Sequence, residues 1–265
     1  MHILLANDDG IWAIGLRALY AALVAGGHDV TVVAPLTEQS AVGHAVTISL
    51  PLRTKEIREN GFTGIGVSGT PVDCVKLGLA ALLTRKPDLV VSGINNGANV
   101  GVDILYSGTV SAATEGALLG LPALAVSVDD FSPTDLTEQA QWTEDFIRRK
   151  DWSAHPKGCL LNLNFPACPM KNAKGLRVCP QTQATYRDWY DTRKDPRGRD
   201  YYWLDGVIPR ENLTPGSDRA LLTNGCITLT PLHFDFTDWP RLETLTREIR
   251  SWSGGGAVGE EDEDD

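Results

Sequence analysis

Two adjacent acids near the start of the chain are the residues best suited to chemistry. Asp8 and Asp9 follow a short apolar run at residues 3–6, and Gly10 comes directly after them. Such a run is typical of a strand buried on both faces of a parallel sheet, and these strands end at the ligand crevice. Adjacent carboxylates repel each other unless a cation lies between them, and hard oxygen ligands suit magnesium, manganese or calcium. The alternative is an ordinary Asp-Asp-Gly turn, and the tetrapeptide at residues 7–10 favours neither interpretation.

A serine in a later loop can reach the same place. Residues 30–34 predict a second strand, and residues 35–43 predict a loop that leaves it at the same edge of the sheet as the two acids. Ser40 lies in this loop and has a neutral hydroxyl that can bind the same cation. The simpler interpretation, an ordinary loop serine, stays open.

An amide-rich loop supplies the next candidates. Residues 88–92 predict another buried strand, and the Gly- and Asn-rich residues 93–101 predict a loop beyond it. Asn95 offers a carbonyl oxygen as a neutral ligand, and Asn96 and Asn99 can orient water or substrate. Asparagine is also common in left-handed turn positions, which explains Asn99 equally well.

A helix start rich in small residues is suited to hold an anion. Ser107, Gly108 and Thr109 begin a predicted small-residue helix, whose free N–H groups and dipole favour an anion such as phosphate. No Gly-Lys-Ser/Thr follows, so this is not a Walker motif. A second predicted helix start, with Thr70 as cap and Pro71 as first helical residue, is interpreted as a cap alone.

The elements that position these residues alternate between strand and helix. Strand, helix and strand within the first 34 residues form a βαβ unit. Extended segments with turns at residues 59–61 and at Gly64 are expected before the helix that begins near Thr70. Further strands are predicted at residues 121–128, 159–165 and 226–230. The pattern predicts an α/β fold with a Rossmann-like, doubly wound and mostly parallel sheet.

The chain is predicted to divide into a large core and three smaller parts. Aromatic residues in a stretch rich in Arg, Asp, Tyr and Trp, with turns at residues 195–198 and 205–206, predict a protruding β-hairpin arm that forms an interface. The predicted parts are a Rossmann-like catalytic core at residues 1–180, the arm at 181–217, a final core strand and C-terminal helix at 218–253, and a disordered acidic tail at 254–265.

Length and charge restrict the class of protein. The chain has 265 residues, of which 42% are hydrophobic, which is typical of a globular enzyme of one or two domains. The six acids at residues 260–265 account for six of the ten net negative charges, so residues 1–259 carry only −4. A mildly acidic body argues against duplex nucleic acid as a partner.

Cysteine usage and hydropathy indicate the compartment. The five cysteines show no Cys-x-x-Cys spacing, so the sequence predicts free thiols rather than disulfides or a zinc site. A core strand directly after Met1 leaves no room for a signal peptide. No apolar run approaches the roughly 20 residues of a membrane span. We therefore expect a cytoplasmic location without membrane attachment.

Five ordered motifs stand out along the chain. They are Asn7-Asp8-Asp9-Gly10, Val33-Ala34-Pro35 with Ser40, Ser68-Gly69-Thr70-Pro71-Val72-Asp73-Cys74, Ser92-Gly93-Ile94-Asn95 and Tyr106-Ser107-Gly108-Thr109-Val110. Together they resemble the SurE (survival protein E) family, and the resemblance extends over residues 1–232. The resemblance implies a phosphatase that depends on a divalent metal and hydrolyses nucleoside 5′- and 3′-monophosphates. It also implies a homodimer or homotetramer that exchanges the arm and the C-terminal segment between subunits.

The resemblance also assigns residues. The family's metal ligands fall by position on Asp8, Asp9, Ser40 and Asn95, which would hold one magnesium or manganese ion per subunit. Ala41 stands where the family usually has glycine. Trp12 and Ile14 replace smaller or proline residues, and these three departures concern the shape of the substrate mouth rather than the metal.

The residues themselves support phosphate chemistry. Two carboxylates with a neutral hydroxyl and amide leave a divalent site near zero net charge, so a phosphate dianion can approach. We expect attack by metal-activated water with Asp8 or Asp9 as the base and with the phosphate held by Asn96, Ser107, Gly108 and Thr109.

Three alternatives stay open. An aspartyl-phosphate mechanism is weakened by the absence of Asp-x-Asp-x-Thr after the first strand. The others are a nucleotide-binding module without catalysis and a metal-dependent glycosyl transfer enzyme. His44 lies near Ser40 and can act as a general acid, although a structural role is the simpler interpretation, and His233 is similarly ambiguous.

Overall fold

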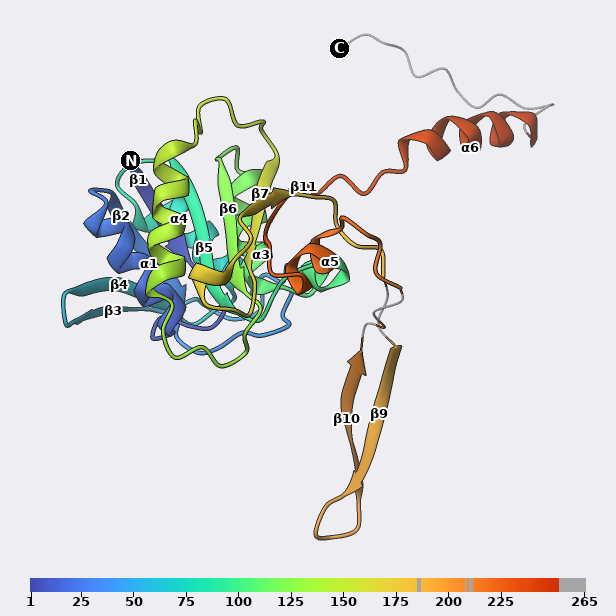
Figure 1. The fold of residues 1–265 in the computed structure, drawn as a ribbon, viewed down its shortest axis with the longest axis horizontal. Helices are drawn as coiled ribbons and strands as arrows, with labels where there is room; N and C mark the ends of the chain where they lie inside the picture. The colour runs from blue at the N-terminus through green and yellow to red at the C-terminus, as the bar shows by residue number, and fades with distance from the viewer. Residues whose placement is uncertain (185–186, 208, 210–211, 253–265) are drawn as a thin grey trace. The chain divides into compact units, whose positions relative to one another are not determined.

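A twisted sheet with a parallel centre organises the molecule (Figure 1). We analysed a computed structural model, which describes residues 1–184, 187–207, 209 and 212–252. Within these residues the strand order is β3-β4-β2-β1-β5-β6-β7-β11-β8. The strands are β1 (His2–Ala6), β2 (Asp29–Pro35), β3 (Thr54–Glu59), β4 (Phe62–Val67), β5 (Leu89–Asn96), β6 (Ala123–Val128), β7 (Cys159–Phe165), β8 (Leu176–Val178) and β11 (Ile227–His233).

The pairing confirms a mostly parallel sheet. β4, β2, β1, β5, β6 and β7 pair in parallel in that order, and β8 is parallel to β11. Only β3 with β4 and β11 with β7 pair antiparallel in the described part of this sheet. The carboxyl ends of six adjacent strands therefore meet at one edge.

Helices cover both faces of the sheet, as a doubly wound fold requires. In β1, Ile3 and Leu5 belong to one apolar cluster with residues of α1 and α4, and Leu4 and Ala6 belong to another with residues of α2 and α3. Side chains alternate along a strand, so these two clusters lie on opposite faces. The helices are α1 (Ile14–Ala25), α2 (Pro71–Leu77), η1 (Gly78–Leu82), η2 (Gly101–Leu105), α3 (Gly108–Leu118), α4 (Thr137–Arg149), η3 (Met170–Asn172), α5 (Asp218–Thr223) and α6 (Trp239–Trp252).

Strand β5 is longer than the sequence predicts, because pairing with β6 resumes after an irregularity. The register shifts between Ser92 and Asn95, and Asn95 and Asn96 then pair with Ser127 and Val128. The prediction that these two asparagines lie in a free loop was wrong. They are strand residues, and the neighbouring strand determines their backbone position.

Two predicted turns were also wrong. The turn between β3 and β4 lies at Asn60 and Gly61, both with positive φ, whereas Gly64 lies inside β4. Gly206 lies inside β10 (Asp200–Val207), which pairs antiparallel with β9 (Arg187–Lys194). The hairpin itself is confirmed. Of the strands in the described residues, β9 and β10 pair only with each other.

The chain divides into two units, Met1–His233 and Phe234–Asp265. Helix α6 belongs to the second unit and has no buried residue in the described part of the chain. The predicted acidic tail at residues 254–265 lies outside the described residues. Among the helices that the structure describes, none combines the length and apolarity needed to span a bilayer.

Candidate functional site

A cleft of about 550 Å³ lies at the carboxyl edge of the sheet, and we call it the Asp8 cleft. It is lined by seven of the residues predicted from the sequence to carry chemistry, namely Asp8, Asp9, Ser40, Asn95, Asn96, Asn99 and Ser107. The two acids follow β1, Asn95 and Asn96 end the adjacent β5, Asn99 comes just after it, Ser40 follows β2, and Ser107 caps α3. Four segments far apart in the sequence therefore contribute to one cleft.

Asp8 is buried and is held at the start of α3. Its Oδ2 accepts a hydrogen bond from the backbone N–H of Thr109 at 2.9 Å, and its Oδ1 accepts one from the Thr109 hydroxyl. Gly108 allows this approach, because a Cβ there would lie 2.7 Å from Asp8 Cβ. The positive end of a helix dipole thus faces a carboxylate.

Thr109 and Gly108 therefore occupy a different place from the one predicted. Thr109 is fully buried and donates to Asp8, and neither residue lines the Asp8 cleft. Ser107 does line it, while its Oγ accepts from the N–H of Val110 at 3.0 Å. Of these three predicted phosphate ligands, Ser107 is the one whose side chain lines the cleft.

The two acids resist ionisation in the absence of a cation. Burial raises the pKa of Asp8. Burial, followed by the charge of Asp8, raises the pKa of Asp9 to about 7, although an N–H of Asn96 donated to Asp9 Oδ2 at 3.1 Å opposes the shift. A cation beside both groups would favour their charged forms.

The neutral candidates have oxygens left for a ligand. The Asn95 amide donates through Nδ2 to the carbonyls of Gly97 at 2.7 Å and Asn96 at 3.2 Å, which leaves its Oδ1 as an acceptor. The Ser40 hydroxyl donates to Glu38 Oε1 at 2.6 Å and keeps its oxygen lone pairs.

These donors suit a hard divalent cation. No cluster of three or more His, Cys, Asp or Glu side chains in the described residues is arranged to hold a metal ion. The set of Asp8, Asp9, Ser40 and Asn95 instead offers two carboxylates and two neutral oxygens. Oxygen-only donors of this kind fit magnesium or manganese rather than zinc.

Two further carboxylates line the cleft. Glu38 and Asp103, which sequence reasoning missed, belong to its lining, and the described lining includes no Lys or Arg, although Arg219 Nη2 lies 3.9 Å from Asp103 Oδ2. The sequence expectation of near neutrality concerned the metal ion and its four ligands alone. Only Glu38, two residues before Ser40, could have been suggested from the sequence, because Asp103 reaches the cleft through the fold.

The structure also places the three residues at which the sequence departs from the family pattern. Ala41 lines the cleft and has φ 56°, a conformation that favours glycine. Trp12 and Ile14 are exposed and do not line the cleft, whereas Ala13 between them does.

Neither histidine considered from the sequence lines the Asp8 cleft. His44 Nε2 instead lies 2.9 Å from Glu115 Oε2, and Lys76 Nζ lies 2.8 Å from the other oxygen of this buried carboxylate. The hydrogen bond from His44, followed by the hydrogen bond and the charge of Lys76, lowers the pKa of Glu115 despite its burial. This geometry favours a structural role for His44.

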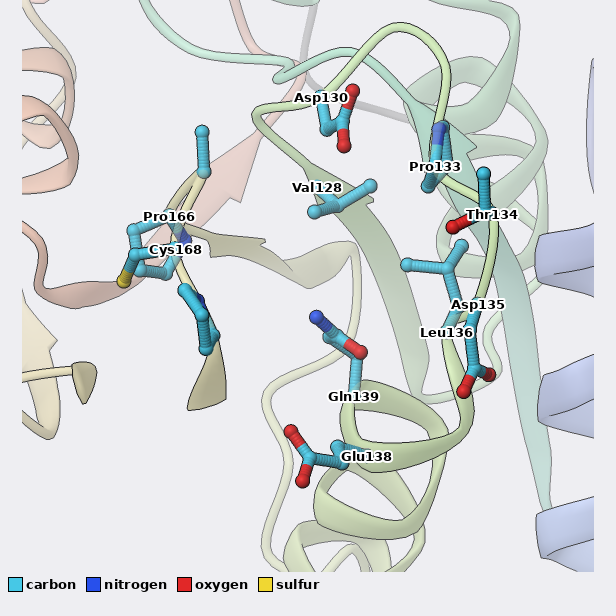
Figure 2. A pocket seen from close by; sticks show the side chains of 12 residues that line it. Val128, Asp130, Pro133, Thr134, Asp135, Leu136, Glu138, Gln139, Pro166 and Cys168 are labelled. Carbon is cyan, nitrogen blue, oxygen red and sulfur yellow. The ribbon is translucent and has the colours of Figure 1, made fainter. Parts of the chain in front are cut away.

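A second hollow, of about 310 Å³, lies beside α4 (Figure 2). Asp130, Asp135 and Glu138 line it, and its described lining contains no Lys, Arg or His. Carboxylates without a basic partner repel an anion. The Asp8 cleft is negative as well, but it brings two adjacent aspartates together with Ser40 and Asn95 at the ends of parallel strands, so it is the better candidate for phosphate chemistry.

Comparisons with known proteins point to one family. The family described as Survival protein SurE matches residues 3–188. A protein named 5'-nucleotidase SurE from Nitratidesulfovibrio vulgaris (strain DSM 19637 / Miyazaki F) is 64% identical over 257 residues, covering 97% of this chain and 96% of that protein. Its namesake from Solidesulfovibrio magneticus is 64% identical over 249 residues, covering 94% and 98%. The crystal structure of the SurE protein from Aquifex aeolicus has a TM-score of 0.82 at 36% identity, covering 94% of this chain and 100% of that one.

Proposed function

This chain belongs to the SurE family, and from that premise we propose that it is a divalent-metal-dependent phosphatase that hydrolyses nucleoside 5′- and 3′-monophosphates. The products are the nucleoside and phosphate. Relatives that share 64% of their residues with this chain are named 5'-nucleotidase. The observation that carries the proposal is the convergence of Asp8, Asp9, Ser40 and Asn95 on one cleft beside the start of α3.

Asp8, Asp9, Ser40 and Asn95 would hold one magnesium or manganese ion. When bound, such an ion polarises a phosphoryl oxygen and lowers the pKa of water. The negative lining of the Asp8 cleft supports this requirement, because Glu38 adds its charge to that of the two aspartates and these groups would otherwise repel a dianion.

The protein's own groups would bind the phosphate and move the proton. The Ser107 hydroxyl and the Asn96 side chain line the cleft and are placed to bind phosphoryl oxygens. Thr109 donates one hydrogen bond to each carboxylate oxygen of Asp8, whereas Asn96 donates a hydrogen bond only to Oδ2 of Asp9. We therefore assign Oδ1 of Asp9 as the atom that accepts the proton of the attacking water, and Asp8 as a fixed ligand.

The proposal also includes self-association of the chain and a cytoplasmic location. The arm exposes aromatic side chains in the single chain, and exposed aromatic patches are typical of interfaces, so we assign the arm to a homodimer or homotetramer. These side chains are Trp189, Tyr190, Tyr201, Tyr202 and Trp203. All five cysteines are free, which suits the reducing cytoplasm. Light scattering coupled to size exclusion tests the assembly.

The decisive experiment is phosphate release from a panel of nucleoside 5′- and 3′-monophosphates. Purified protein is assayed in chelator, and then with magnesium or manganese added. We expect release only with metal. Folded protein that binds nucleotides but releases no phosphate with any metal would instead be a nucleotide-binding module.

A further inference from the structure

Two exposed aromatic residues line the Asp8 cleft. Tyr106 is 60% exposed and Phe131 is 82% exposed, and neither is among the residues assigned above to the metal or the phosphate. The volume of the cleft, about 550 Å³, falls in the range of about 300–1,000 Å³ that is typical of small-ligand sites. The cleft therefore has room for more of a ligand than its phosphate.

Phe131 rests directly on the segment that carries two of the proposed ligands. It lies in the loop between β6 and α4, and β6 is the neighbour of β5 in the sheet. The N–H of Gly97 donates to the carbonyl of Asp130 at 2.9 Å, which joins this loop to the end of β5. A Cβ at Gly97 would lie 2.7 Å from Phe131 Cε1, so the ring packs on the backbone immediately after Asn96.

The loop separates two hollows and directs Phe131 into one of them. Asp130 lines the acidic hollow beside α4 (Figure 2). Phe131, the next residue, lines the Asp8 cleft. The most exposed aromatic ring of this cleft is thus supported from below by Gly97 and lies on the same wall as the proposed phosphate ligand Asn96.

We propose that Phe131 is the stacking platform for the nucleobase of the substrate. This inference rests on the proposed function and deepens it by assigning the base subsite. A phenyl ring offers a face but no hydrogen bond, so it binds any planar heteroaromatic base and binds the larger purines more strongly than the pyrimidines. The subsite confers affinity for nucleotides over phosphate esters that lack a base.

The test compares two substrates that differ only in the base. Wild type and Phe131→Ala are assayed with adenosine 5′-monophosphate and with ribose 5-phosphate. We expect Phe131→Ala to lower kcat/KM for the nucleotide about 10- to 100-fold, mainly through KM, and to leave the value for ribose 5-phosphate within about twofold. Phe131→Trp should restore the preference, since it keeps an aromatic face.

A matched control separates stacking from the general loss of an exposed ring. Phe236 is 84% exposed and does not line the Asp8 cleft, so Phe236→Ala should leave both substrates unchanged. Equal loss on both substrates in Phe131→Ala, or no loss on either, would refute the base subsite. If wild type hydrolyses neither compound, the proposed function fails, and calorimetric binding of adenosine 5′-monophosphate to wild type and Phe131→Ala still decides the subsite.

Discussion

Thr109 donates two hydrogen bonds to Asp8, one from its backbone N–H and one from its hydroxyl. The pair joins the end of β1 to the first turn of α3, and both residues are buried. Each carboxylate oxygen receives one donor, so the carboxylate plane has a fixed orientation while lone pairs stay available on both oxygens. Support of this kind is what a metal ligand requires to keep its geometry.

Removing the Thr109 hydroxyl should therefore impair activity more than folding. Thr109→Val keeps the backbone donor and the shape, and we expect it to lower kcat about 10- to 100-fold by releasing one Asp8 oxygen. Thr109→Ser keeps the hydroxyl and should retain most activity. Steady-state kinetics and circular dichroism check both variants. Wild-type turnover in Thr109→Val would show that the hydroxyl does not position Asp8.

Close packing at Gly108 makes a second prediction. In Gly108→Ala the new Cβ would lie 2.7 Å from Asp8 Cβ and 3.0 Å from Pro71 Cγ, so α3 must shift away from β1. We expect a loss of about 1–3 kcal/mol in the free energy of unfolding and a larger loss of activity. The control is Gly78→Ala, whose Cβ would meet Leu4 at 3.4 Å, an ordinary contact. Chemical denaturation compares the two, and equal stabilities would contradict the prediction.

Metal binding and pH should be linked through Asp9. Its pKa in the folded protein is about 7, above the ordinary value of 3.8, so the native state binds the proton more tightly than the unfolded chain. In chelator, stability should therefore fall as the pH rises from about 4 to about 7. Added magnesium favours the charged form and should raise Tm more at pH 8 than at pH 6.

Asp9→Asn provides the control for this linkage. The amide cannot titrate, so both the fall of stability in chelator and the pH dependence of the magnesium effect should shrink. Phosphate release should also be abolished, because Asp9 is the assigned proton acceptor. A magnesium effect on Tm that is equal at both pH values in wild type would overturn the linkage.

The buried Glu115 should stabilise the fold in a pH-dependent way. Its pKa is lowered by the hydrogen bond from His44 and by the hydrogen bond and charge of Lys76, so the stabilisation is present above the ordinary pKa of 4.5 and is lost as the pH falls through the lower folded value. Glu115→Gln should cost about 1–3 kcal/mol at pH 7 and less at pH 4.

Urea unfolding of Glu115→Gln at both pH values checks this prediction. The matched control is Glu56→Gln, because Glu56 pairs with Arg58 at 3.1 Å with both side chains exposed. Exposed pairs contribute little, so this variant should change stability by less than about 1 kcal/mol at either pH. If Glu115→Gln lowers the free energy of unfolding by as much at pH 4 as at pH 7, the loss comes from packing rather than from charge.

Several elements could be predicted because their signals are local. Strands β1 and β7 are rich in apolar residues, and an apolar run is sufficient to predict a strand that is buried on both faces. Thr70 was recognisable as a helix cap, and it accepts the expected hydrogen bond from a backbone N–H in the first turn, that of Asp73. The positions of Asp8, Asp9 and Ser40 at strand ends followed from these elements.

Other features depend on contacts between distant segments. Asn95 and Asn96 read as loop residues because only their pairing with β6 makes them strand residues. Strand β8 and helix α5 were missed, since three and six residues carry too little periodicity to predict an element.

The amino-acid sequence by itself determined the fold class, the succession of core strands along the chain and the acids and neutral oxygens at their ends. The tertiary structure alone decided that Thr109 holds Asp8 and that Asp103 and Phe131 line the cleft. The physical reason is the separation of the interacting residues along the chain. Helix caps and strand periodicity depend on a few neighbouring residues. The chemical environment of a side chain depends instead on which distant segments pack against it.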